Sequence, residues 1–465
     1  MKFSILTFGC RVNQADSLRL EEDLRRRGGE PAASSEADIV VVNTCSVTAT
    51  ADQGARQAIR RVARENPAAR IVATGCYATR SPDELASLPG VVRVVRNDLK
   101  LDLDEILGPS TAERFGDGEG PCGELLQPGM AGRTAFTLRV QTGCDQPCSY
   151  CIIPTTRGRG RSLPVAHVVN EATRVAQAGF KEIALTGVHL GSYGRDLDVP
   201  SSLFDLLYAL AAIEADVTFR ISSLEPMDCT PELVDLVALS GGRFAPHFHL
   251  PLQHGSDRML RAMRRPYTQG FYADLVVTIV EKLPHASIGT DMIVGFPGES
   301  DADFGESLDY LSGAPLSHVH VFPYSDRPGT EASLLSNKVP GQVVRQRGAA
   351  LRQVGATLSA RFQSSQIGSI RPGLTLEDGT LVVTDNYLKV RISQGHARNE
   401  RVLVQLITPV TAVTCMPVQI GSQDETADVG VDIGRLDGTP RARSDRHPVR
   451  RVIPARRNRP VVQPR

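Results

Sequence analysis

The sequence lacks the features that mark membrane-spanning and secreted proteins. No stretch approaches the roughly 18 consecutive apolar residues of a membrane span, and the apolar start at 3–10 runs into Arg11 without a small-residue cleavage site. Nine cysteines, an odd number in a long chain without an export signal, argue against a disulfide framework and for reduced thiols, metal ligation or catalysis. We therefore expect a cytoplasmic protein with no membrane contact.

A net charge is also absent, since Lys+Arg and Asp+Glu balance at 52 each. This excludes a chain that is basic throughout, which would point to nucleic-acid binding over the whole surface. The balance is uneven, because residues 435–465 contain ten Arg against two Asp, net +8, and the preceding 434 residues carry −8. With 465 residues, 41% hydrophobic and 22% charged, the composition predicts a globular protein of about two to four domains.

Three β-prone runs near the N-terminus each end in a cysteine. The runs are residues 2–10, 38–45 and 70–76, and they end in Cys10, Cys45 and Cys76. Helical patterns at 17–28 and 51–65 lie between them, which predicts βα units and a parallel sheet. The carboxyl ends of such strands share one edge of the sheet, so the three thiols are expected to lie together. Their equivalent positions favour ligation, although free cysteines are also common as small core residues.

The rest of the chain divides by composition. A Gly/Pro-rich stretch at 115–129 predicts a linker. After it, six strand-like runs alternate with helical patterns and predict a parallel α/β architecture, either an open sheet or a partial barrel; the runs are 137–143, 182–186, 217–222, 248–252, 288–295 and 319–323. Short alternating runs at 368–418 predict a small antiparallel β-barrel. Beyond 423 the chain loses aromatics and gains Pro and Arg, so we expect it to be disordered.

The strongest motif is Cys144-Asp-Gln-Pro-Cys148-Ser-Tyr-Cys151, placed just after an apolar run. Three thiols within eight residues can close on one metal centre but supply no fourth ligand locally. A structural zinc site uses four closed ligands, and a thioredoxin-type pair needs only Cys-x-x-Cys. Ligation of a [4Fe–4S] cluster by three thiolates leaves one iron open for an exogenous ligand.

This motif resembles the radical S-adenosylmethionine superfamily, whose members bind S-adenosylmethionine at the open iron. Together with further motifs it is similar to the methylthiotransferases; these motifs are Thr7-Phe-Gly-Cys10-Arg-Val-Asn-Gln14, Val42-Asn-Thr-Cys45, Thr74-Gly-Cys76-Tyr77, Arg220-Ile-Ser-Ser-Leu-Glu-Pro226, Leu250-Pro-Leu-Gln253 and Asp291-Met-Ile-Val-Gly-Phe-Pro-Gly-Glu299. The resemblance covers roughly residues 1–420. It implies an α/β protein with an N-terminal parallel-sheet methylthiotransferase domain (1–120), a linker (121–131), a radical core with a partial (β/α)6 barrel (132–366) and a TRAM-like β-barrel (367–421), followed by a basic Arg/Pro-rich tail (422–465).

The resemblance also implies cofactors and their ligands. It assigns one [4Fe–4S] cluster to Cys144, Cys148 and Cys151, with Tyr150 packed beside it, and a second cluster to Cys10, Cys45 and Cys76. Gly187 and His189, in a Gly-rich turn after a predicted strand, and Gly295 and Glu299, in another, are candidates for contact with S-adenosylmethionine. A plain βα turn explains the Gly-rich segment with Gly187 nearly as well, a lone histidine such as His189 is more often structural, and the segment with Gly295 and Glu299 would also serve simply to turn the chain. Cys122, Cys229 and Cys415 lack partners at ligand spacing and are assigned no function, and no catalytic residue is assigned.

Within the family, residues 7–14 look like the branch that modifies N6-threonylcarbamoyladenosine beside the tRNA anticodon, whereas isopentenyladenosine-modifying relatives tend to show Tyr-Gly-Cys-Gln-Met-Asn there. One departure is Gln253-His254-Gly255, because His is also seen in the branch that modifies a ribosomal-protein aspartate. The resemblance implies methylthiolation at adenine C2, with S-adenosylmethionine as methyl donor and radical source and an external low-potential electron donor. A cofactor must carry this step, because that C–H bond is not acidic enough for acid–base chemistry.

Two alternatives stay open. The same chemistry would serve isopentenyladenosine tRNA or a ribosomal-protein aspartate, and a non-enzyme with structural metal sites would bind RNA. In the barrel, Asn386, Tyr387, Lys389 and Arg391 place an aromatic among cations, which suits a base stack with phosphate contacts. The arginine pairs at 450–451 and 456–457 suit salt-sensitive phosphate binding, and a solubilising extension fits them equally well.

Overall fold

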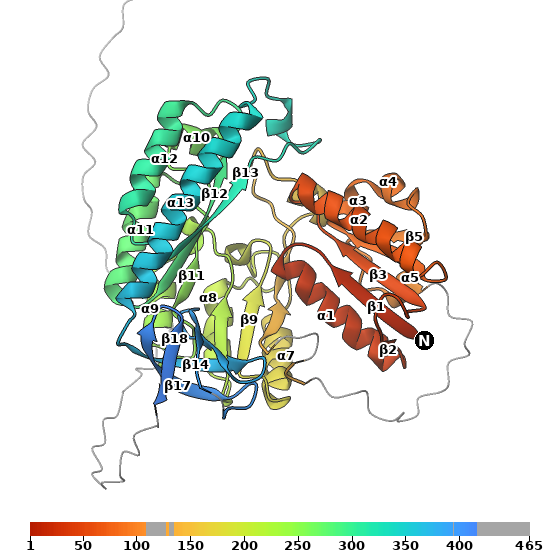
Figure 1. The fold of residues 1–465 in the computed structure, drawn as a ribbon, viewed down its shortest axis with the longest axis horizontal. Coiled ribbons are helices and arrows are strands. Elements are labelled where there is room, and N and C mark those ends of the chain that lie inside the picture. The colour runs from red at the N-terminus through yellow and green to blue at the C-terminus, as the bar shows by residue number, and fades with distance from the viewer. Residues whose placement is uncertain (108–126, 130–133, 394, 416–465) are drawn as a thin grey trace, which may run out of the picture. The chain divides into compact units, whose positions relative to one another are not determined.

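The structure is a computed structural model, and it describes residues 1–107, 127–129, 134–393 and 395–415 (Figure 1). The predicted tail at 422–465, most of the predicted linker at 121–131 and Cys122 lie outside the described residues. No helix among the described residues is long and apolar enough to cross a membrane.

The N-terminal part is one parallel five-stranded sheet in the order β2-β1-β3-β4-β5. Its strands are β1 (Lys2–Thr7), β2 (Glu30–Pro31), β3 (Ile39–Thr44), β4 (Arg70–Gly75) and β5 (Val91–Val95). Its helices are α1 (Arg11–Arg26), α2 (Ala49–Glu65), α3 (Cys76–Arg80), α4 (Pro82–Ala86) and α5 (Leu103–Leu107). The predicted parallel sheet is confirmed, although β2 and β5 were not predicted and α1 begins six residues before the predicted 17–28.

The central strand β3 explains why both faces of this sheet are covered. All six of its residues are buried, which is typical of a strand between two helical layers. Val40 and Val42 pack with α2 residues on one face, and Ile39 and Val41 pack with residues of α1 and α5 on the other.

The second part has six parallel strands in two hydrogen-bonded sets, β10-β9-β6 and β11-β12-β13. The strands are β6 (Phe136–Arg139), β9 (Glu182–Thr186), β10 (Thr218–Ile221), β11 (His247–His249), β12 (Ser287–Val294) and β13 (His318–Pro323). Isolated parallel bridges at Phe219–Phe244 and Ser223–His249 join the sets, and no pair of described residues joins β6 to β13. The six strands therefore form the predicted partial barrel rather than a closed one.

Helices cover the outside of this partial barrel (Figure 1). They are α7 (Val165–Gln177), α8 (Leu203–Ala211), α9 (Pro231–Leu239), α10 (Asp257–Ala262), α11 (Gln269–Lys282), α12 (Asp301–Gly313) and α13 (Gly341–Ser365). Polar residues begin several of them; Ser202 and Ser300 form capping boxes with Asp205 and Asp303. A short antiparallel pair, β7 (Gln141–Thr142) and β8 (Arg161–Ser162), flanks the small helix α6 (Ile153–Arg157).

The third part is a closed barrel in the order β14-β15-β16-β18-β17. Its strands are β14 (Ile370–Leu376), β15 (Leu381–Thr384), β16 (Lys389–Arg391), β17 (Arg401–Thr408) and β18 (Thr411–Cys415). The pairs are antiparallel except for β16 with β18, and Val382, Val390 and Val404 fill the interior. The predicted small β-barrel is confirmed, and it fits a TRAM domain.

The barrel docks on the partial barrel through specific hydrogen bonds. Arg220 of β10 donates to the Asp385 carbonyl at 2.9 Å, and Asn399 donates to the Gly179 carbonyl at 2.8 Å. The described residues up to 415 belong to one compact unit. The barrel turn that carries Tyr387 is thereby held against the strand ends of the core.

Candidate active site

The first cysteine trio, Cys10, Cys45 and Cys76, stands at the carboxyl ends of three neighbouring strands. Cys10 caps α1 after β1, Cys45 follows β3, and Cys76 is the first residue of α3 after β4. Gly9 has a φ of 91°, and a Cβ there would overlap the Cys45 side chain. Only glycine therefore lets the first two loops approach this closely.

Electrostatics show that these thiols lie close to one another. Burial and, to a smaller extent, the neighbouring thiols of Cys10 and Cys76 raise the pKa of Cys45 to about 11. Three thiolates at one site, two of them on the buried residues Cys45 and Cys76, repel each other unless a cation neutralises them. Because metal ligation requires thiolates, this donor set fits an iron–sulfur cluster with three protein ligands.

Arg157, the last residue of α6, reaches the first trio from the partial barrel. Only 4% of it is exposed; Cys76, Asp16 and Cys10 raise its pKa against the opposing effect of burial. Its Nη2 donates to Asn13 Oδ1 at 2.5 Å, but among the described residues its Nε has no hydrogen-bond partner. A buried unpaired donor beside three thiols suits a site that takes an additional acceptor, such as the sulfide of a cluster.

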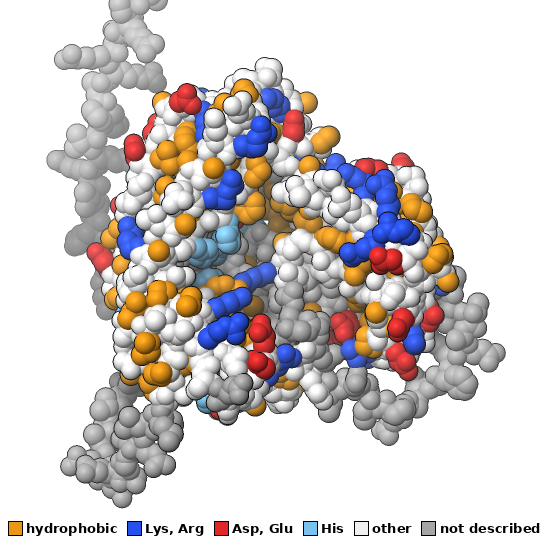
Figure 2. All heavy atoms as spheres, viewed as in Figure 1, with side chains coloured by type: hydrophobic (Ala, Val, Ile, Leu, Met, Phe, Trp, Pro, Cys, Tyr) orange, Lys and Arg blue, Asp and Glu red, His pale blue; other side chains and the backbone are white. Residues whose placement is uncertain are grey.

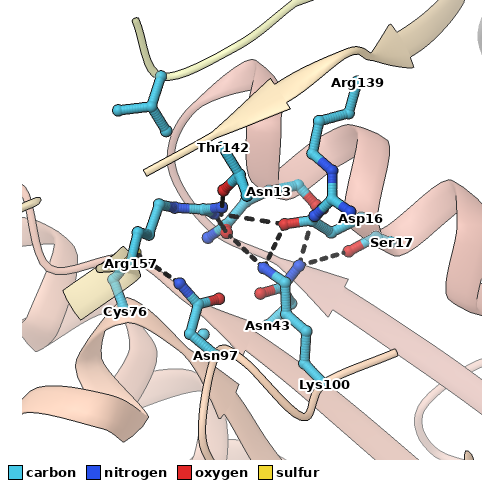
Figure 3. Close-up of polar contacts among 12 residues, drawn as sticks. Asn13, Asp16, Ser17, Asn43, Cys76, Asn97, Lys100, Arg139, Thr142 and Arg157 are labelled. Atoms are coloured by element: carbon cyan, nitrogen blue, oxygen red, sulfur yellow. Dashed lines mark hydrogen bonds and ion pairs between the residues drawn. The ribbon is translucent and has the colours of Figure 1, made fainter. Parts of the chain in front are cut away.

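Behind the trio, Asp16 gathers three cations into what we call the Asp16 network. Lys100, Arg139 and Arg157 converge on its carboxylate from three different segments (Figure 3). Burial would raise the pKa of Asp16, but the three cations lower it to about 2. Asn13 belongs to the network, since Lys100 also donates to its Oδ1 at 3.2 Å. The network ties α1 of the sheet to β6 and α6 of the partial barrel.

The second cysteine trio, Cys144, Cys148 and Cys151, lies in the loop between β7 and α6. Burial raises the pKa of Cys151 to about 12, and Cys148 and Cys144 contribute in the same direction. Arg265 Nη1 donates to Cys148 Sγ at 3.1 Å. Here too three adjacent, partly buried thiols fit a cluster with one open iron, as the spacing predicted.

Arg265 was missed in the sequence and is held in place by two further groups. Its guanidinium pairs with the Glu225 carboxylate, and its Nε donates to the Tyr267 hydroxyl at 2.9 Å. Tyr150 is partly buried; burial raises its pKa, and Arg265, Cys148 and Cys151 act on it, which places it beside the trio. No local motif marks Arg265, because Glu225 and Cys148, the two charged or cluster-binding partners, lie far away in sequence.

Gly187 and His189 lie in the turn after β9. Gln141 Oε1 accepts from the backbone nitrogens of Val188 and His189 at 3.0 and 2.9 Å, which fixes the turn. His189 Nε2 lies 2.8 Å from Asp228 Oδ2. Burial would lower the pKa of His189, but hydrogen bonds to Asp228 and Cys144 raise it to about 9. His189 thus lies next to the second trio, whereas Gly187 faces the pocket described below.

Gly295 and Glu299 lie together at the end of β12. The Glu299 carboxylate accepts from the Gly295 nitrogen, pairs with Arg347 at 3.0 Å and contacts His254 Nε2 at 3.3 Å. His254, only 1% exposed, also accepts from the Ser256 nitrogen through Nδ1 at 3.0 Å. His254, the residue at which the sequence departs from the threonylcarbamoyl branch, therefore belongs to a buried packing cluster. It is not among the residues that line the pocket described next.

A pocket of about 690 Å³ brings the three parts of the chain together. Its walls include Cys10 and Arg11 from the sheet, Gly187 and Asp291 from the partial barrel, and Tyr387 from the β-barrel. This volume is in the range of pockets that enclose a small organic ligand. Figure 2 shows a hollow on this face with histidine side chains exposed in its wall.

The histidines of this wall were not predicted. His247 and His249 of β11 and His318 and His320 of β13 line the pocket. Ring nitrogens of His249, His318 and His320 lie within 4.8 Å of one another. The sequence carries a signal for them, since both strands show His-x-His, and alternate residues of a strand share one face.

The β-barrel contributes less to the surface than its sequence predicted. Asn386 is fully buried, and its Nδ2 donates to the His285 carbonyl at 2.9 Å and to Gln366 Oε1 at 3.1 Å, so the prediction that it contacts RNA is wrong. Tyr387 is 38% exposed and lies at the pocket, and Lys389 and Arg391 are exposed. Cys229 is buried and Cys415 partly buried.

A parallel partial barrel whose first βα loop carries Cys-x-x-x-Cys-x-x-Cys defines an enzyme of the radical S-adenosylmethionine class. Family models agree, because residues 138–311 match the Radical SAM superfamily and residues 2–96 match Uncharacterized protein family UPF0004. The radical S-adenosylmethionine methyltransferase TsrM from Kitasatospora setae, solved with cobalamin and a [4Fe-4S] cluster, gives a TM-score of 0.51 at 17% identity, covering 72% of this chain and 77% of that one. At that identity the likeness concerns the fold alone.

Curated relatives identify the family. The threonylcarbamoyladenosine tRNA methylthiotransferase MtaB of Aquifex aeolicus (strain VF5) is 39% identical over 402 residues, which are 84% of this chain and 96% of that protein. The protein of the same name from Bacillus subtilis (strain 168) is 35% identical over 406 residues, 83% of this chain and 88% of that protein. This chain belongs to the radical S-adenosylmethionine methylthiotransferase family, in its MtaB-like branch.

Proposed function

We propose that this protein methylthiolates C2 of N6-threonylcarbamoyladenosine next to the tRNA anticodon. It uses two [4Fe–4S] clusters and S-adenosylmethionine, which serves as methyl donor and radical source, and receives electrons from an external low-potential donor in the cytoplasm. The names of the curated relatives at 35–39% identity support the tRNA substrate.

The pocket carries this proposal. It opens at Cys10 of the first trio, and Gly187, in the turn that also holds His189 beside the second trio, lines its wall. Two reactive centres must meet one base, and a single pocket walled by all three parts of the chain gives that base a place shielded from water.

In the proposed site, the second trio holds one cluster and the first trio the other. When bound, the clusters and S-adenosylmethionine supply the one-electron chemistry that an unactivated C–H bond requires. The protein's own groups position these centres: Arg265 donates to Cys148, Arg157 lies beside Cys76, and the Asp16 network fixes Arg157.

Gly187 and His189 are our candidates for direct contact with S-adenosylmethionine, because their turn lies beside the second trio. Gly295 and Glu299 belong to the same proposal as positioning residues, since protein groups already engage both Glu299 oxygens. Lys389 and Arg391 on the β-barrel are candidates for phosphate contacts.

The test is anaerobic reconstitution followed by nucleoside mass spectrometry. Reconstituted protein is given tRNA carrying threonylcarbamoyladenosine, tRNA carrying isopentenyladenosine, and the ribosomal protein with its target aspartate. The 2-methylthio derivative of the first substrate alone is the expected product. Product from either of the others would redirect the substrate, and one zinc per chain without S-adenosylmethionine cleavage would establish the non-enzyme alternative.

A further inference from the structure

The pocket wall offers more groups that can donate a hydrogen bond to an anion than carboxylates that would repel one. Asp291 is the one carboxylate among its described lining residues, against Arg11 and four histidines. Its Oδ1 is already engaged, by His249 Nε2 at 3.1 Å and His320 Nδ1 at 3.3 Å. Figure 2 shows Lys or Arg side chains beside the exposed histidines of this hollow. Such a wall is suited to an anionic group.

Arg11 is the fixed cation of this wall. It begins α1, directly after Cys10, and is partly buried. Its Nη1 donates to Ser222 Oγ at 3.3 Å and its Nη2 to the Tyr387 hydroxyl at 3.0 Å. Among the described residues no carboxylate pairs with it. A guanidinium held by two neutral hydroxyls keeps its full charge and free N–H groups for a ligand.

A neighbouring arginine shows the contrast. Arg220 also lies against the Tyr387 ring, but it is 1% exposed and donates to both Glu182 oxygens, at 3.0 and 2.8 Å. Its charge is neutralised inside the protein, as is usual for a buried cation. Arg220 and, to a smaller extent, Arg11 lower the pKa of Glu182 against the effect of burial, but among the described residues Arg11 makes no ion pair with that carboxylate, so its N–H groups stay available to the pocket.

Tyr387 holds Arg11 in this position, and its own backbone is strained. Its φ is 71°, in the left-handed region that a residue with a Cβ rarely adopts. Its ring lies 4.8 Å from the guanidinium of Arg220 and 4.7 Å from the His247 ring. Strain of this kind persists where surrounding contacts impose it, often at ligand sites.

The histidines beside Arg11 are closely packed. Gly289 makes room for them, since a Cβ there would overlap the His318 ring. Burial, together with the neighbouring rings of His249 and His320, lowers the pKa of His318 to about 4, so the ring is neutral and offers one N–H. The hydrogen bond to Asp291 raises the pKa of His320, and Arg11 opposes that shift, which shows that both act on the same ring.

The spacing of these ring nitrogens would also suit a divalent transition metal. The fixed charge of Arg11 on the same wall opposes a second cation and attracts an anion. The charge of Arg11 reaches the His320 ring, so we take an anion as the occupant, and a metal ion is an outcome of the test.

From this geometry we infer that Arg11, assisted by His318 and His320, binds the carboxylate on the N6 substituent of the substrate adenosine. The inference rests on the proposed function and deepens it, because it names the residue that separates a threonylcarbamoyl group from an uncharged isopentenyl group. Arginine binds carboxylates through two parallel N–H groups. Since Arg11 follows Cys10, a substituent held there keeps the adenine in the pocket that this thiol enters.

The test pairs a change in the protein with a change in the ligand. Anticodon stem-loop RNAs carry threonylcarbamoyladenosine, either as the free acid or as its neutral carboxamide, and equilibrium affinities are measured with the reconstituted full chain. Wild type is expected to bind the acid about 10- to 100-fold more tightly than the carboxamide. Arg11→Gln should bring this ratio close to 1, whereas Arg11→Lys should keep part of it.

Arg26→Gln is the matched control, because it removes the same charge from the far end of α1. It should leave the acid-to-carboxamide ratio at the wild-type value. Iron content of each variant establishes that the clusters are intact; if Arg11→Gln loses iron, Arg11→Lys and the two RNAs still measure the ratio. Because the ratio is taken within one protein, general damage to the fold cancels.

The outcomes separate the inference from the proposed function. If wild type methylthiolates the threonylcarbamoyl RNA but the ratio is the same in all Arg11 variants, the inference is wrong and the proposed function stands. If wild type modifies only isopentenyl RNA or a protein, the proposed function fails first. A preference for the acid that requires added zinc and is independent of Arg11 would overturn the inference and assign the histidines to a metal.

Discussion

Replacing Asp16 by Asn is expected to destabilise the protein strongly, because it removes the common partner of three cations. The Asp16 side chain is 1% exposed, and those of Lys100 and Arg157 are 3% and 2% exposed. A pKa lowered from 3.8 to about 2 corresponds to about 2.5 kcal/mol of stability at neutral pH. Leaving buried cations uncompensated costs about 3–5 kcal/mol. We therefore expect a loss of about 3–5 kcal/mol at pH 7.

The sign of the pH dependence follows from the lowered pKa. A carboxyl with a lower pKa in the folded state stabilises the protein above its unfolded value of about 4 and loses this contribution as the pH falls toward 2. The difference in the free energy of unfolding between wild type and Asp16→Asn should therefore have its full size at pH 7 and at pH 5. It should shrink only below pH 4.

The assay is urea unfolding of the reconstituted protein under anaerobic conditions. Far-UV circular dichroism is the signal, since the chain has no Trp. With a slope of about 2.5 kcal/mol/M, the expected loss lowers the urea midpoint by about 1–2 M. Asp23→Asn on the same helix, whose surface ion pairs are with Arg19 and Arg26, should cost less than about 1 kcal/mol. Equal midpoints for the two variants would refute the reasoning.

Three further predictions concern the cofactors and tRNA. Alanine at all three positions of the second trio should leave one [4Fe–4S] cluster and abolish S-adenosylmethionine cleavage, whereas the same change in the first trio should leave cleavage and abolish methylthiolation; loss of all iron from a folded variant would contradict separate sites. Truncation at Gln423 should weaken tRNA binding and flatten its salt dependence if the arginine-rich tail contacts phosphates, and unchanged affinity in a salt titration would make the tail a passive extension. Tyr387→Phe removes the hydroxyl that holds Arg11, so affinity for threonylcarbamoyl tRNA should fall about 3- to 10-fold with unchanged iron content. A Phe variant that binds this tRNA like wild type would exclude the positioning role of Tyr387.

Local patterns in the sequence predicted the features that depend on local physics. The runs ending in Cys10, Cys45 and Cys76 were recognisable because parallel strands buried on both faces are nearly all apolar and end at one edge. The alternation at 368–418 predicted the small barrel for a similar reason. The predicted helix boundaries were less accurate. Helix α1 starts at Arg11, but its first residues are mostly polar and show no helical repeat of apolar residues.

The groups that surround the cysteines could not be predicted in the same way. Arg157 lies 141 residues from Asp16, and Arg265 lies 117 residues from Cys148. In the sequence each is one arginine among many, and only the tertiary fold selects it. The histidines of β11 and β13 did carry a visible period of two, but the sequence does not show that only β12 separates the two strands in the sheet, which brings these histidines to one wall.

The origin of Arg157 has a consequence for how the enzyme matures. The sheet that bears Cys10, Cys45 and Cys76 leaves the ribosome first. Two of the three cations that pair with Asp16, Arg139 and Arg157, belong to the partial barrel and are synthesised later. A nascent sheet alone would hold its aspartate with Lys100 only. Its cysteine site therefore reaches its final electrostatic surroundings after the partial barrel has folded, so the order of biosynthesis delays completion of this site until the rest of the enzyme is in place.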